Sequence, residues 1–125
     1  MMESYSKTIH IEAKTLTEMA EKDFLPALLS YLGDVASIAL QKQTLLPSAA
    51  SEAEKELVQK LSDSYEEISR LLNILKEDTL EAEGLTDLLK SAQYYHKTIL
   101  SDMEALRSCI DEAEAMVTDD RLPYP

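Results

Sequence analysis

Two histidines, His10 and His96, are the side chains of this 125-residue chain best suited to acid–base or phosphoryl chemistry. In a histidine phosphotransfer module, lysine stands three residues after the phosphoaccepting histidine, but Ala13 and Ile99 occupy that spacing here. His96 also lies close to an apolar stripe of helical period. We therefore interpret His96 as a partly buried structural histidine. Phosphotransfer stays a hypothesis, ranked behind the two functions given at the end of this subsection.

Metal ligands do not occur at the spacings that metal centres use. A di-iron bundle needs Glu-x-x-His pairs, and Gln93 stands where the glutamate before His96 would be required. One cysteine and two scattered histidines do not support a zinc site either. Neighbouring carboxylates at positions 66 and 67, 81 and 83, and 112 and 114 do not face one another on a helix, which indicates a solvated surface.

The single cysteine, Cys109, cannot form an internal disulfide bond. Its neighbours Leu106 and Ile110 place it beside an apolar seam, so we expect a small, partly buried side chain and not a nucleophile. The two glycines are isolated and form no phosphate-binding loop. We predict no catalytic, cofactor-binding or metal-binding residue in this chain.

The net charge of −12 predicts an acidic, well-solvated surface. Such a surface argues against nucleic acid and against anionic membranes as partners, because both attract clustered lysine and arginine. No run of eighteen apolar residues occurs, and the first residues lack the features of a signal peptide. We expect a cytoplasmic protein without a membrane partner.

Apolar residues recur every three or four positions and predict a first helix from about 6 to about 43. Pro26 lies inside this pattern, so we expect the helix to be kinked or broken near residues 22–26. Gly33 weakens the helix locally and suggests close approach of a neighbour.

A second helix is predicted from about 52 to about 82, with Ser51 and Glu54 as a capping box and Gly84 as the stop. The third is predicted from about 85 to about 118, capped by Thr86 or Gly84, and residues 119–125 form an extended tail. Long helices joined by short connections must be antiparallel. We therefore predict a single all-α domain over residues 1–125, an elongated antiparallel three-helix bundle.

Both ends of the chain resemble the C-terminal region of type III glutamine synthetases, the large bacterial form. The matching positions are Tyr5, residues 7–9, residues 11–13, Thr15, residues 19–20, 22–23 and 26–27, then Met103, Leu106, Arg107, Asp111, Glu114, Val117, Asp119, Asp120 and residues 123–125. Leu122 stands where the family usually has tryptophan, and residues 44–95 match only in being helical and rich in glutamate.

The resemblance implies a C-terminal helical domain, a fragment of a larger oligomeric ligase of nitrogen metabolism with two stacked rings. The family ligates ammonia to glutamate through a γ-glutamyl phosphate, using ATP and Mg²⁺ or Mn²⁺. The family's residues that bind metal, nucleotide and glutamate lie in upstream segments, so the resemblance assigns none of these roles to a residue of this chain. The implied role is structural, and the implied partners are the catalytic domain and neighbouring subunits. The alternative is a stand-alone acidic helical-bundle module that binds a basic or amphipathic partner.

Overall fold

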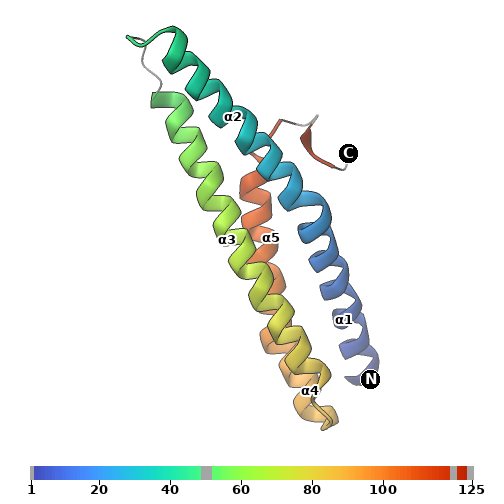
Figure 1. Ribbon diagram of the computed structural model, residues 1–125. Coiled ribbons are helices and arrows are strands. Elements are labelled where there is room, and N and C mark those ends of the chain that lie inside the picture. The colour runs from blue at the N-terminus through green and yellow to red at the C-terminus, as the bar shows by residue number, and fades with distance from the viewer. Residues whose placement is uncertain (1, 49–51, 119–120, 124–125) are drawn as a thin grey trace.

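Three long helical rods, joined at alternate ends, build the molecule (Figure 1). The computed structural model describes residues 2–48, 52–118 and 121–123, with side chains from Ser4 onward. Within this described part, all regular structure is helical and the rods are antiparallel. The predicted all-α bundle is confirmed.

The first rod contains α1 (Met2–Glu18), a π-helical turn (Met19–Phe24) and α2 (Leu25–Leu45). The helix continues through Pro26, so the predicted break is wrong and the predicted kink is not confirmed. Pro26 lies in the first turn of α2, directly after the π-helical turn. A missing amide proton is tolerated best at such a position, because the wide turn already interrupts the regular bonding pattern.

The second rod is α3 (Glu52–Glu83), and Gly84 follows its last residue as predicted. Ser51 lies outside the described residues, so the proposed capping box has no structural description. The carboxylate of Glu54 accepts a hydrogen bond from Lys42 Nζ at 2.8 Å, which ties the start of α3 to the end of α2.

The third rod contains α4 (Leu88–Tyr94), a second π-helical turn (Tyr95–Ile99) and α5 (Leu100–Glu114). Its cap is Asp87, whose Oδ1 accepts a hydrogen bond from the Lys90 amide at 2.9 Å. The rod therefore begins after the predicted caps Thr86 and Gly84, and it ends four residues before the predicted boundary at 118.

The end of the chain differs from the predicted extended tail. The Arg121 amide donates to the Thr118 carbonyl at 2.9 Å, so the chain turns at this point. Residues 119–120 and 124–125 of the predicted tail lie outside the described residues.

The core runs between the three rods and contains side chains from all of them. Its largest completely buried members are Phe24, Leu28, Leu61, Ile68, Leu75, Ile99, Met103 and Leu106. Among the described residues Thr79 is the one buried polar side chain, and its Oγ1 donates to the Leu75 carbonyl at 2.7 Å. Burying such side chains is the main stabilising contribution in a bundle of this size.

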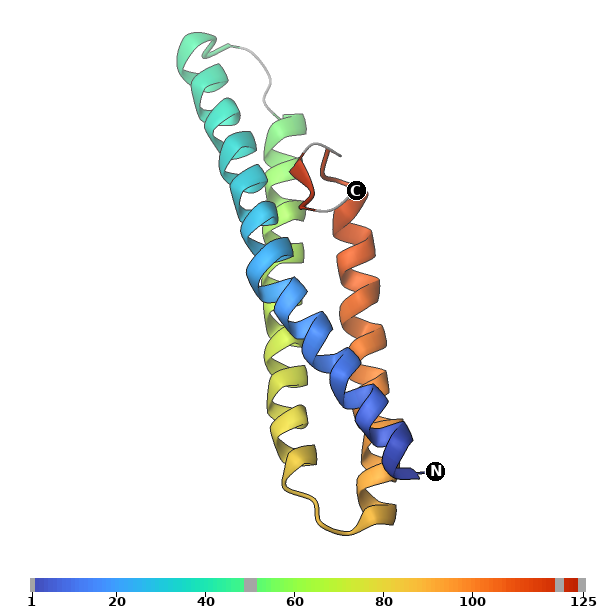
Figure 2. The same cartoon turned by 90° about the vertical axis from the view of Figure 1, so that its right-hand side faces the viewer.

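The bundle is not three helices thick along its whole length. Figure 2 shows that α5 ends before the far end of the α2–α3 pair is reached. We call residues 37–45 and 52–60 the two-helix end, and no residue in either stretch is buried. Gly33, close to this end, has no heavy atom within 4 Å of the position of an added Cβ, so the predicted close approach is wrong.

Candidate docking surface

The outward-facing side of α2 is almost free of charge. Only Asp34 and Lys42 are charged among its 21 residues. Both are already used inside the bundle, since Asp34 is paired with Arg121 and Lys42 with Glu54. The hydrogen bond from Lys42 also holds the pKa of the Glu54 carboxyl below its ordinary value. In a chain with a net charge of −12, this helix offers a neutral surface.

Large apolar side chains project from that neutral surface into solvent. Their exposed fractions lie between 49% and 79%, and they are Leu29, Ile38, Leu40, Leu45 and Leu46, which follows the helix directly. These five are half of the ten large exposed apolar side chains among the described residues. Single exposed apolar residues are ordinary, whereas a group on one element marks a contact surface. We call these five residues the α2 outer surface.

Shallow hollows follow the seam between α2 and α3. Near the two-helix end, Ala36 and Leu40 line a hollow with Val58 of α3. Farther along, Leu29 lines another hollow with Tyr65. Because Leu29, Ala36 and Leu40 are spaced by seven and four residues, they lie on one side of the helix. A second helix can pack against such a ridge.

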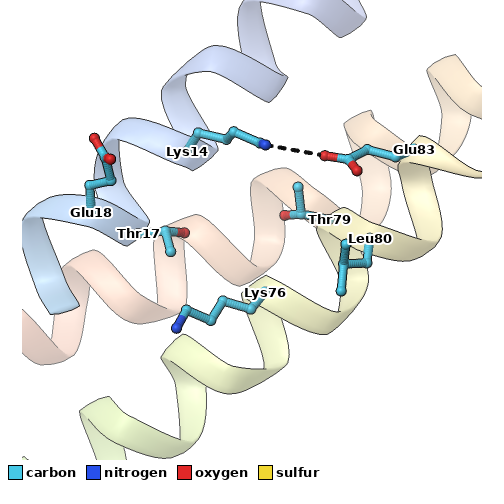
Figure 3. A pocket seen from close by; sticks show the side chains of 7 residues that line it. All are labelled: Lys14, Thr17, Glu18, Lys76, Thr79, Leu80 and Glu83. Carbon is cyan, nitrogen blue, oxygen red and sulfur yellow. Dashed lines mark ion pairs between the residues drawn. The ribbon is translucent and has the colours of Figure 1, made fainter.

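The same seam continues between α1 and α3 as a hollow of about 380 Å³ (Figure 3). Its lining comprises Lys14, Thr17, Glu18, Lys76, Thr79, Leu80 and Glu83. Lys14 Nζ lies 3.5 Å from Glu83 Oε1, and Lys76 is paired with Glu21. These two ion pairs join the first rod to α3, whereas Glu18 is paired with Lys22 within the first rod.

The two histidines hold the first rod to the third. His10 Nδ1 lies 3.0 Å from the Tyr95 hydroxyl, and its Nε2 lies 3.6 Å from Glu83 Oε1. His96 Nδ1 lies 2.8 Å from the Tyr5 hydroxyl. His96 is exposed, which corrects the prediction of partial burial. The π-helical turn beginning at Tyr95 places that tyrosine in the core instead, and burial raises the pKa of its hydroxyl.

Cys109 lies where the sequence predicted. It is partly buried beside the core, and burial, followed by the charge of Glu112, raises the pKa of its thiol. Such a thiol is a poor nucleophile at neutral pH. Within the described ranges, no group of three or more histidine, cysteine, aspartate or glutamate side chains is placed to hold a metal ion.

Sequence reasoning missed the α2 outer surface. The available indication was compositional, because two charged residues in a 21-residue helix are few for a chain in which 29% of residues are charged. By length and composition alone, the helical stretch Ser4–Leu45 could also cross a membrane, although no eighteen-residue apolar run is present. Length and composition are weak evidence, so the expectation that nothing in the chain spans a membrane stays a prediction.

Comparison with known proteins gives a consistent result at both ends of the chain. Residues 1–43 match the family described as the glutamine synthetase C-terminal domain. Over 125 residues, the chain is 41% identical to the glutamine synthetase of Butyrivibrio fibrisolvens. Over 128 aligned residues, which cover 99% of the chain, it is 23% identical to the glutamine synthetase of Bacteroides fragilis strain YCH46. The chain spans 18% of the length of each relative.

Proposed function

The chain belongs to the glutamine synthetase C-terminal domains, and from this premise we propose that it is a structural domain of a large, type III enzyme. It packs through the α2 outer surface against the catalytic domain or a neighbouring subunit. The ligation of ammonia to glutamate, with its ATP and Mg²⁺ or Mn²⁺, takes place on other parts of the polypeptide. The enzyme is oligomeric and cytoplasmic in this proposal.

The observation that carries the proposal is the combination of exposure and neutrality on α2. A helix that is apolar on several sides belongs in the interior of a larger structure or in a membrane. The three-helix bundle covers only Leu25, Leu28 and Val35 of α2 well enough to bury them. Something else therefore covers the remainder, and the relatives are several times longer than this chain.

The exposed apolar side chains on both flanks of α2 favour a broad, packed interface rather than a narrow contact. Leu29 and Leu40 face the α3 seam, whereas Ile38 and Leu45 project from the opposite flank. A partner that covers both flanks removes the five apolar side chains from water, at about 25 cal/mol per Å² of apolar area. The similarity to glutamine synthetases over the whole chain favours this role over that of a stand-alone acidic module.

A reconstitution experiment tests the proposal. The Butyrivibrio fibrisolvens glutamine synthetase is prepared without its segment matching this chain and is then mixed with the chain. We expect binding and a gain in ATP-dependent glutamine formation, whereas the chain alone forms none. Glutamine formation by the chain alone, or absence of any binding, would contradict the proposal.

Charged substitutions then locate the surface. We expect Leu29→Glu combined with Leu40→Glu to weaken binding by about tenfold or more, because each carboxylate loses its water in a neutral interface. The matched control is Ile11→Glu, which changes an exposed side chain on α1 and should leave binding unchanged. Equal losses from both variants would reject α2 as the contact. Binding of the chain to neutral lipid vesicles would instead assign α2 to a membrane.

A further inference from the structure

The hollows between the first rod and α3 follow one another along most of the length of α3. They are lined by one stripe of each rod, because the lining residues recur at helical intervals of three, four or seven. On the first rod, this stripe contains Glu18, Glu21, Leu25, Leu29, Ala36 and Leu40. On α3, it contains Lys55, Val58, Tyr65, Ser69, Leu72 and Lys76. We call this line of hollows the seam groove.

The seam groove lies on the open side of two antiparallel helices. Figure 1 shows α5 behind the seam between the first rod and α3, so α5 covers this pair from one side. On the other side, large apolar side chains stand along the groove, and Leu40, Leu29 and Leu80 have exposed fractions of 66%, 49% and 68%. The open side of such a pair is the position that a further helix takes in a four-helix bundle.

The charges of the lining favour an apolar partner with little charge of its own. Lys76 is paired with Glu21, and Lys14 Nζ lies 3.5 Å from Glu83 Oε1, so these charges are compensated within the chain. Among the described residues that line the groove, Lys55 is the one charged side chain without an ion-pair partner. A partner that matches this lining has an apolar stripe and one carboxylate opposite Lys55.

We propose that the seam groove binds a fourth, amphipathic helix, which belongs to the part of the enzyme outside this chain. This inference rests on the proposed function and names the chemistry of the partner that covers Leu29 and Leu40. Residues 55–83 of α3 span about 42 Å, so about 28 residues of helix fill the groove. Such a helix places an apolar side chain in the groove at every third or fourth position. The relatives, of which this chain spans 18%, contain ample further polypeptide.

Leu80 separates this inference from the proposed function, because it lines the groove beside α1 and lies outside the α2 outer surface. We expect Leu80→Glu to weaken binding to the truncated Butyrivibrio fibrisolvens enzyme by about tenfold, since the carboxylate loses its water beneath an apolar helix. The matched control is Leu89→Glu on α4, where an exposed leucine lines none of these hollows, and it should leave binding unchanged.

The outcome for Leu80 decides between the two statements. If Leu80→Glu has no effect while Leu29→Glu combined with Leu40→Glu weakens binding, the fourth helix is rejected and the proposed function stands. Absence of any binding contradicts both.

Reversing the charge of Lys55 tests for the carboxylate on the partner. We expect Lys55→Glu to weaken binding by about threefold or more, because two carboxylates then face each other. Lys60→Glu changes the net charge equally at an exposed position of the same helix and should have little effect. Equal losses from both variants would show that no carboxylate faces Lys55.

The spacing of cross-links distinguishes a helix from other occupants. Leu29 and Leu40 are eleven residues apart on α2, which corresponds to about 16 Å. A photo-reactive phenylalanine analogue in place of either leucine should mark the truncated enzyme at two sites about eleven residues apart, whereas an extended chain covers that distance in about five. Marked sites about five residues apart, sites in two separate segments, or marks on a second copy of this chain would overturn the proposal.

Discussion

Along most of the molecule α3 packs against both other rods, whereas at the two-helix end, beyond α5, α2 is the only rod beside it in the part of the chain that the structure describes (Figure 2). Ile68, Leu75 and Leu106 are completely buried in the three-helix part. At the two-helix end, Leu57 is partly buried and Leu40 is exposed. Among these leucines and isoleucines, complete burial therefore occurs only where a third rod is present, because two helices alone leave one side of each stripe open.

The charge pattern differs between these regions in a way that composition alone does not explain. Outer positions of α5 carry Glu104, Arg107 and Glu112, as expected for a surface that remains in water. Outer positions of α2 carry leucine, isoleucine, serine and glutamine. The difference fits the proposed function, in which α2 packs against another part of a larger enzyme and α5 stays in water.

The largest expected effect on the free energy of unfolding comes from truncating a large buried side chain in the core of the three-helix part. Phe24 is completely buried, and Phe24→Ala should lower the free energy of unfolding by about 3–5 kcal/mol. Leu40→Ala, at the two-helix end, should change it by less than about 0.5 kcal/mol. Urea unfolding of both variants measures the contrast, and equal losses would show that the two regions are not different.

A smaller effect of opposite sign is expected at Gly33. Alanine is the better helix former by about 1 kcal/mol, and an added Cβ at this exposed position meets no other atom within 4 Å. Gly33→Ala should therefore raise the free energy of unfolding of the isolated chain by up to about 1 kcal/mol. A decrease, measured by the same urea titration, would mean that α2 is not a regular helix there.

The smallest expected effect concerns the contact between the chain end and α2. Arg121 is paired with Asp34 and lies 6.0 Å from the centre of the Tyr31 ring. Both the ion pair and the cation–π contact are solvent-accessible, so Arg121→Ala should cost less than about 1 kcal/mol. The loss should shrink in high salt. A salt-independent loss would indicate that packing, and not charge, holds this end.

The three rods were predictable because their apolar period extends over many turns, which a single proline does not erase. The third rod begins later than predicted, because the side chain that caps its first turn is that of Asp87, and neither Thr86 nor Gly84 is the cap. The sequence predicted partial burial of His96, whereas the structure buries its neighbour Tyr95 and exposes His96. The π-helical turn that begins at Tyr95 places Tyr95 in the core, and no pattern of residue types in the sequence predicts such a turn.

The candidate docking surface was harder to predict than the fold. The α2 outer surface depends on where α5 ends, which is a property of the packed bundle.

The π-helical turn at Met19–Phe24 also has a consequence for chain length. Such a turn accommodates one surplus amino acid, and each amino acid in an α-helix advances the azimuth by about 100°. Excising a single residue from this segment would therefore convert the wide turn to regular α-helix, and the following side chains of the rod would keep nearly the same orientation relative to those of α1. Without the turn, the surplus residue would instead rotate every following side chain by about 100° and turn the leucines of α2 away from the core.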